Sequence, residues 1–102
     1  MKAYNIPSEL LDLIPGYIER RKSEVADLQL FLENRDFESI EKIGHKLKGN
    51  GASFGFDHLT ELGELLMIAA RSKSVVQMQK LIGEFDDEVS HIKNSPEVKF
   101  SE

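Results

Sequence analysis

The chain has 102 residues, no cysteine and a formal net charge of −5 at pH 7. This length suits one domain and is too short for a kinase catalytic domain beside a second module. The lack of cysteine excludes disulfides and thiolate metal sites, and the acidic balance argues against nucleic acid as the main ligand. No apolar run approaches the roughly 20 residues that span a bilayer, and the polar opening residues do not form a signal peptide. We therefore expect a cytoplasmic protein that binds neither nucleic acid nor membrane.

Helical periodicity extends over most of the sequence, and no strand-like alternation competes with it. A short helix is expected to open at Ile6–Ser8 and to run through Leu13. Pro15 favours a fresh helix start, because proline fits the first turn, where its missing N–H does no harm. Apolar residues at helical spacing continue this second helix until Asn34–Asp36 interrupts the pattern.

A third helix is expected to begin after Asp36, a good N-cap residue, and to end at Gly55. Asp57 is expected to cap the next helix, and a final helix should run from about Val75 to Lys93 before a polar tail at about residues 95–102. Four long amphipathic segments with short connections predict an all-α fold. We expect residues 1–102 to form one domain, an antiparallel up-down-up-down four-helix bundle with a short extra N-terminal helix.

The third helix holds the most unusual segment of the chain, around one histidine. Gly44, Gly49 and Gly51 each cost a helix roughly 1 kcal/mol relative to alanine, so a small-residue requirement is expected. His45 projects about 170° from the centre of the apolar stripe, which predicts an imidazole in solvent. That stripe consists of Ile40, Ile43, Leu47 and Phe54. Gly51 lies on the stripe and suits tight packing, whereas Gly49 faces water one turn from His45.

Lysines are concentrated around this histidine, at Lys42, Lys46 and Lys48. A neutral imidazole near pH 7 is a competent nucleophile, and a phosphoryl group added to it would bring negative charge and strong acceptor oxygens. Lys48, at i+3 from His45, could hold those oxygens. The same lysines would also suit the solvated face of an amphipathic helix. Both interpretations stay open on this pattern alone.

Metal and hydrolase sites are not favoured. Helical bundles hold two metal ions through paired Glu-x-x-His motifs, but here that spacing occurs singly, at Glu88 and His91. His58 and His91 are expected to be ordinary surface residues. Ser53 lies near His45, but no carboxylate is placed to orient the ring. We therefore expect no metal ligands.

The motif around the histidine resembles the histidine-containing phosphotransfer (HPt) domains of multistep phosphorelays. In that family a phosphorylated histidine is followed by a variable residue, an aliphatic residue, Lys, Gly and a small polar residue, and later by an apolar residue and Gly. The matching residues are His45, Lys46, Leu47, Lys48, Gly49, Asn50, Phe54 and Gly55. The resemblance continues in Leu59, Leu62, Gly63 and Leu66. The chain departs from the pattern at Gly44 and Gly51, where the family commonly has alanine or serine.

The resemblance implies a phosphocarrier rather than an enzyme. His45 would accept a phosphoryl group from a receiver-domain aspartate and pass it to another receiver aspartate. Lys48 would stabilise the phosphoryl oxygens. The further binding residues would be Lys42, Lys46, Gly49, Asn50, Ala52 and Gly55. The partners would be response-regulator receiver domains or a hybrid histidine kinase, and the receiver would supply Mg²⁺, so that the chain needs no cofactor of its own.

Two other functions stay open. In one, the chain is an adaptor that docks a receiver or another helical partner on the same face without phosphorylation, and His45 is only a contact. In the other, the bundle serves oligomerisation, which would need an exposed apolar stripe on a second helix face. The sequence shows no such stripe.

Overall fold

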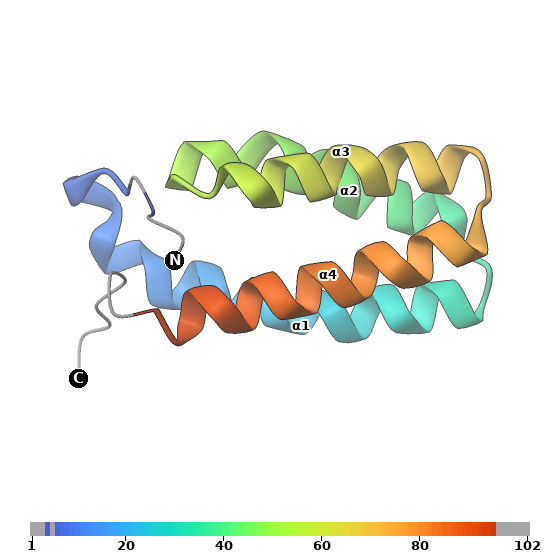
Figure 1. Cartoon of the computed structure of the whole chain (residues 1–102), viewed down its shortest axis with the longest axis horizontal. Coiled ribbons are helices and arrows are strands. Elements are labelled where there is room, and N and C mark those ends of the chain that lie inside the picture. The colour runs from blue at the N-terminus through green and yellow to red at the C-terminus, as the bar shows by residue number, and fades with distance from the viewer. Residues whose placement is uncertain (1–3, 5, 96–102) are drawn as a thin grey trace.

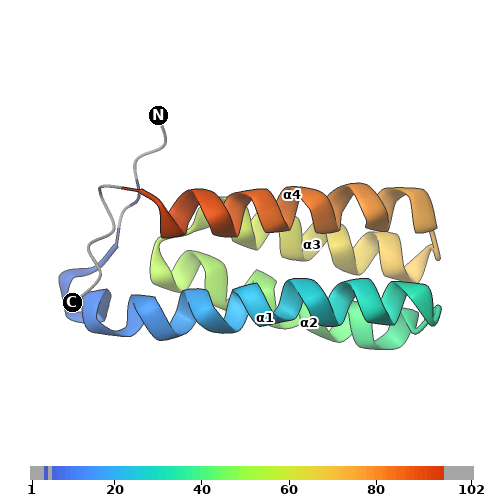
Figure 2. The ribbon, with the colours of Figure 1, turned by 90° about the horizontal axis from the view of Figure 1, so that it is seen from below.

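The computed structural model describes residues 4 and 6–95 of the chain. Within these residues it has two short 3-10 helices and four α-helices: η1 (Ser8–Leu13), α1 (Ile14–Glu33), α2 (Phe37–Gly51), η2 (Ala52–Phe54), α3 (Asp57–Arg71) and α4 (Val75–Lys93). Each α-helix runs antiparallel to the next, and together they form an elongated bundle (Figures 1 and 2). The most extensive helix contact joins α2 to α3. The predicted all-α bundle is confirmed, with a 3-10 helix as its short N-terminal element.

Local sequence accounts for three of the helix starts. Pro15 occupies the first turn of α1, where no amide is needed. The Asp36 carboxylate caps α2, because it accepts hydrogen bonds from the Ser39 amide at 3.2 Å and the Ser39 hydroxyl at 2.6 Å. The Ser74 hydroxyl accepts the Gln77 amide at 3.4 Å at the start of α4. The starts expected after Asp36 and at about Val75 are confirmed, and the start expected at Pro15 lies one residue earlier, at Ile14.

The connection between α2 and α3 differs from the prediction. The α-helix ends at Gly51, and residues 52–54 tighten into η2 before Gly55 turns the chain with a φ of 88°. The N-cap of α3 is Phe56, and Asp57 is the first helical residue, so the predicted Asp57 cap is wrong. The cause is tertiary: the Phe56 ring is buried, and its amide donates to the Gly51 carbonyl at 2.8 Å. The helix therefore starts directly after that anchored residue.

The core is apolar and draws on all four α-helices. Its largest fully buried side chains include Ile14, Leu28, Ile40, Leu47, Leu59, Leu66, Met78 and Phe85. Each such side chain contributes about 1.5–3 kcal/mol of transfer free energy. The predicted polar tail begins with Ser95, which is buried, and its remaining residues 96–102 lie outside the described residues. Within the described ranges, no helix is both long and apolar enough to cross a membrane.

Helices α2 and α3 approach so closely that their contact excludes side chains. A Cβ on Gly63 would lie 2.5 Å from the backbone nitrogen of Lys48 and 2.7 Å from the carbonyl oxygen of Gly44. A Cβ on Gly51 would lie 2.6 Å from the Thr60 nitrogen. The packing role expected of Gly51 is confirmed, and Gly44 and Gly63 share it. This contact fixes the register between the helix that carries the histidine and its neighbour.

Candidate functional site

His45 lies on the exposed face of α2, opposite the buried residues Ile40 and Leu47, as predicted. Helical pitch places Glu41 one turn before it and Gly49 one turn after it. A Cβ on Gly49 would meet nothing within 4 Å, so this part of α2 presents bare backbone to solvent. A partner surface can therefore approach the imidazole from the Gly49 side.

A shallow hollow of about 480 Å³ lies beside the imidazole. Its lining consists of Glu38, Glu41, Lys42, His45 and Lys46 from α2 and Arg71 from α3. The three cations in this lining outnumber the two carboxylates, although the whole chain carries a net negative charge. A local excess of positive charge attracts anions. The hollow therefore suits a negatively charged group on the histidine.

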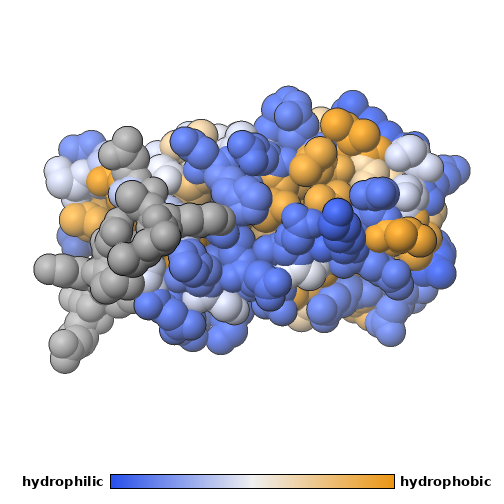
Figure 3. All heavy atoms as spheres, in the orientation of Figure 1, coloured by the Kyte–Doolittle hydropathy of each residue, from blue (hydrophilic) through white to orange (hydrophobic). Residues whose placement is uncertain are grey.

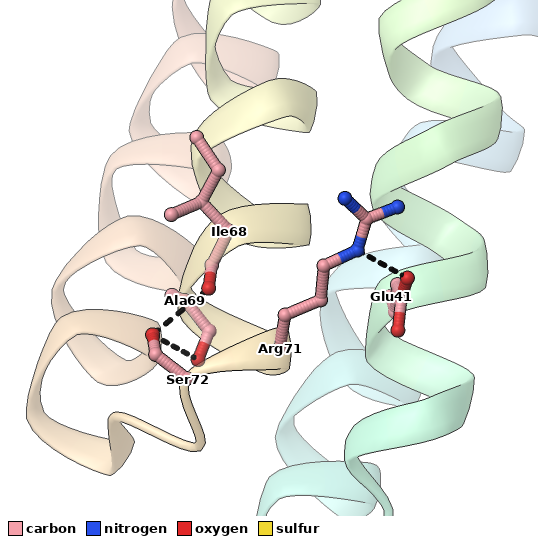
Figure 4. A network of polar contacts seen from close by, with 5 residues as sticks. All are labelled: Glu41, Ile68, Ala69, Arg71 and Ser72. Carbon is pink, nitrogen blue, oxygen red and sulfur yellow. Dashed lines mark hydrogen bonds and ion pairs between the residues drawn. The ribbon is translucent and has the colours of Figure 1, made fainter.

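Arg71 enters this site from the last turn of α3. Its Nε donates a hydrogen bond to Glu41 Oε2 at 2.6 Å across the two helices (Figure 4). The adjacent Ser72 hydroxyl donates to the Ile68 carbonyl at 2.9 Å and secures the end of α3. The contribution of Arg71 was not predicted from the sequence, because periodicity within one helix does not show what a neighbouring helix contributes. Folding α2 back on α3 at Gly55 would have identified it.

Lys48 stands on the other side of His45 along α2. Its Nζ lies 3.3 Å from Glu64 Oε1, and the lysine side chain is 45% exposed. The Thr60 hydroxyl donates to the Lys48 carbonyl at 3.1 Å and accepts the Ala52 amide at 2.7 Å, which fixes this turn of the helix. Exposed ion pairs contribute only about 0–1 kcal/mol. Lys48 can therefore exchange Glu64 for another anion at small cost.

The two other predicted lysines flank the histidine differently. Lys42 lies 3.8 Å from Glu38 in a highly exposed pair. Lys46 faces α1, where burial raises the pKa of the Glu24 carboxyl and the charges of Arg21 and Lys46 oppose that rise. Both lysines line the same hollow as His45.

Asn50, Ala52 and Gly55 lie outside the lining of the hollow, as do Lys48 and Gly49. Asn50 Oδ1 accepts a hydrogen bond from the Tyr17 hydroxyl at 2.7 Å and so ties α1 to α2. Burial raises the pKa of that tyrosine, whose ring stacks on Phe54 at a centroid distance of 4.3 Å. The three residues shape the end of α2 and the turn after it. Their binding role stays a prediction.

The other two histidines have contacts away from the hollow. His58 Nδ1 lies 3.4 Å from Glu61 Oε2, and the His91 ring lies 6.2 Å from the Tyr4 ring. In the part of the chain that the structure describes, no three His, Asp or Glu side chains are grouped so that they could hold a metal ion. Of the three histidines, His45 is the one that lines the hollow.

Comparison with known proteins agrees with this geometry. The family model described as "Hpt domain" matches residues 12–95. The "Multistep phosphorelay regulator 1" of Schizosaccharomyces pombe is 29% identical over 72 residues, which cover 71% of this chain and 24% of that protein. The chain thus spans about a quarter of the length of this relative. No solved structure gives a significant match. The family match covers most of the chain, including His45 and the helices α1 and α3 on either side of α2 in the sequence. The chain therefore belongs to the family of Hpt domains.

Proposed function

We propose that this chain is a phosphorelay carrier. His45 accepts a phosphoryl group from the aspartyl phosphate of one receiver domain and passes it to an aspartate of another. The observation that carries the proposal is the exposed imidazole beside a hollow lined by Lys42, Lys46 and Arg71. The family match, and the phosphorelay named for the relative in S. pombe, support it.

The transfer is a displacement at phosphorus. A lone pair on one imidazole nitrogen attacks the phosphorus, an N–P bond forms, and the P–O bond to the aspartyl carboxylate breaks. The carboxylate leaves with the bonding electrons. In the second transfer the carboxylate of the next receiver attacks the same phosphorus, the N–P bond breaks, and its electrons return to the imidazole. The histidine therefore ends as it began, which is the behaviour of a carrier.

In this proposal, Lys48 and Arg71 stabilise the phosphoryl oxygens. Each cation pairs with one carboxylate, Glu64 for Lys48 and Glu41 for Arg71. A charge-assisted hydrogen bond to a phosphoryl oxygen contributes about 1.5–3 kcal/mol, whereas an exposed ion pair contributes about 0–1 kcal/mol. An exchange of partners is therefore favourable once the phosphoryl group is present. The planar guanidinium of Arg71 can bind two of its oxygens.

The receiver brings the remaining parts of the reaction. It supplies the reacting aspartate and the Mg²⁺ that offsets charge on the transferring group. The partners of this chain are accordingly receiver domains, either separate response regulators or the receiver of a hybrid histidine kinase. In this proposal the chain is a phosphocarrier rather than an enzyme.

Mixing the purified chain with a receiver that has been phosphorylated by acetyl phosphate and Mg²⁺ tests the proposal. We expect an acid-labile, base-stable phosphoryl label on the wild type and none on His45→Gln, although both bind the receiver. His58→Gln and His91→Gln are matched controls and should keep the label. Equal labelling of His45→Gln would refute the assigned site. A receiver that binds the wild type without labelling it would favour the adaptor function.

A further inference from the structure

Arg71 is held at the His45 hollow by a single hydrogen bond. Its Nε donates to Glu41 Oε2 at 2.6 Å, and its two terminal nitrogens donate no hydrogen bond within the described residues. In Figure 4 both terminal nitrogens point away from Glu41, along α2 toward the C-terminal end of that helix. His45 follows Glu41 by four residues, so it lies one turn farther in this direction and on the same face. The unused N–H donors of Arg71 are therefore directed toward the level of the imidazole.

Helix α3 itself provides no anchor for this side chain. Ion pairs within a helix join residues three or four apart, and those positions before Arg71 are Ile68 and Met67. All six residues at 65–70 are apolar, and Figure 3 shows apolar atoms gathered over this C-terminal half of α3. Two of these side chains are about half exposed, so the expectation that no second helix face has an exposed apolar stripe was wrong. The orientation of the Arg71 guanidinium depends on Glu41 of α2.

The side chain of Arg71 needs such an anchor, although its backbone is fixed. At the end of α3 the Ser72 hydroxyl donates to the Ile68 carbonyl at 2.9 Å and lies 3.3 Å from the Ala69 carbonyl (Figure 4). The Arg71 side chain is 61% exposed, and the ordering of its rotatable bonds opposes binding. The hydrogen bond to Glu41 orders the side chain before a phosphoryl group arrives, which lowers the entropy cost of the new contact.

The guanidinium can keep Glu41 and still bind a phosphoryl group. It carries N–H donors on three nitrogens in one plane, so the two terminal nitrogens can bind two phosphoryl oxygens while Nε stays on the carboxylate. Lys48 has one nitrogen for both Glu64 and a phosphoryl group, whereas Arg71 has separate nitrogens for its two anions. For Arg71, keeping both anions is more favourable than an exchange, because no hydrogen bond is lost.

Charge alone would give Glu41 the opposite effect. A carboxylate near a phosphoryl group repels it, and the hollow is lined by two carboxylates, Glu38 and Glu41. Glu38 lies 3.8 Å from Lys42 in a highly exposed pair. Glu41 instead holds Arg71, with the guanidinium on the side toward the C-terminal end of α2 (Figure 4). Removal of Glu41 should therefore speed transfer if repulsion dominates and slow it if the placement of Arg71 dominates.

We propose that Glu41 is a positioning residue for phosphotransfer. It holds Arg71 through Nε, so that both terminal nitrogens of the guanidinium are ready to bind oxygens of the phosphoryl group on His45. This inference rests on the proposed carrier function and adds to it how the cation from α3 is oriented.

Transfer rates of three variants test this role. A receiver that is phosphorylated by acetyl phosphate and labels the wild type is mixed with each chain in rapid-quench experiments. Glu41→Ala should lower kcat at saturating receiver about three- to fivefold, because Arg71 must then be ordered during the transfer, while KM stays within about twofold. Glu41→Gln should recover most of the rate, since its amide oxygen can accept the same hydrogen bond. Glu38→Ala removes an equal charge from the same hollow without touching Arg71, and it should not lower kcat.

Two further measurements separate positioning from a merely structural effect. In an Arg71→Gln background, Glu41→Ala should change kcat by less than about 1.5-fold, because no guanidinium is left to position. In ¹H–¹⁵N spectra, the Arg71 Nε–H signal should change less on phosphorylation of His45 than on the Glu41→Ala substitution. Exposed ion pairs contribute little to stability, so all variants should fold, and circular dichroism checks this.

A Glu41→Ala variant with kcat at or above the wild-type value would overturn the positioning role and leave the carrier function intact. A loss of kcat that is equally large in the Arg71→Gln background would also overturn it. So would an Nε–H signal that moves, on phosphorylation, to its position in Glu41→Ala. A wild-type chain that no receiver labels would instead overturn the carrier function and, with it, this inference.

Discussion

Alanine in place of Gly63 should weaken the fold at the contact that fixes the site. The added Cβ would lie 2.5 Å from the backbone nitrogen of Lys48, 2.7 Å from the carbonyl oxygen of Gly44 and 3.0 Å from the carbonyl carbon of Leu47. All three are backbone atoms, which cannot rotate away, so α2 and α3 must separate by roughly 0.5–1 Å to restore normal contact distances. Overpacking costs about 1–3 kcal/mol, and the upper end applies to a rigid contact. Alanine returns about 1 kcal/mol of helix propensity, which leaves a net loss of about 2 kcal/mol.

Gly49→Ala and Gly83→Ala are the matched controls for this substitution. A Cβ at either position would meet nothing within 4 Å. Each should therefore stabilise the chain by about 0.5–1 kcal/mol through helix propensity and reduced freedom of the unfolded chain. Urea unfolding at constant temperature, followed by circular dichroism, should separate Gly63→Ala from both controls by about 2.5–3 kcal/mol. A Gly63→Ala variant as stable as Gly49→Ala would refute the close approach of α2 and α3.

Further predictions concern the site and the cap of α2. Lys48→Ala should slow phosphotransfer about five- to tenfold without unfolding the bundle, since it removes one partly exposed charge-assisted hydrogen bond. Arg71→Gln should slow it by a similar factor. If rapid-quench measurements give a variant the transfer rate of the wild type, the substituted residue does not stabilise the phosphoryl group. Gly49→Glu should raise the receiver KM about tenfold or more by bulk and charge, and titration of the rate with receiver would show an unchanged KM if Gly49 lies outside the contact. Hydrogen bonds from the Ser39 side chain and backbone hold the pKa of Asp36 below its ordinary value, so its stabilising effect is present above the unfolded pKa of about 3.9 and is lost as the pH falls through the lower folded pKa. Asp36→Asn should therefore lose less stability than wild type between about pH 5 and about pH 2, and equal losses in thermal unfolding would contradict this.

Patterns within single helices predicted most of the architecture. Asp36 and Pro15 mark helix starts through chemistry that acts over three or four residues, and the structure agrees at both. The exposure of His45 follows from helical period alone, because the buried stripe of α2 is narrow. The positive φ of Gly55 likewise matches a glycine at the end of a helical segment.

The features that the sequence did not predict depend on contacts between helices. The need for glycine at positions 44 and 63 becomes clear only from the contact between the two helices. A Cβ on Gly44 or Gly63 would collide with the backbone of the other helix. Arg71 reaches the His45 hollow through the antiparallel register of α2 and α3.

The most direct test of the carrier function is a chase of the phosphoryl group through His45. The wild-type chain is labelled by a phosphorylated receiver, purified, and added to a fresh unphosphorylated receiver with Mg²⁺. The account predicts that the acid-labile label leaves the histidine and appears on the aspartate of the second receiver at a rate that depends on receiver concentration. A label that remains on the chain, or that is lost to inorganic phosphate without reaching any receiver, would contradict it.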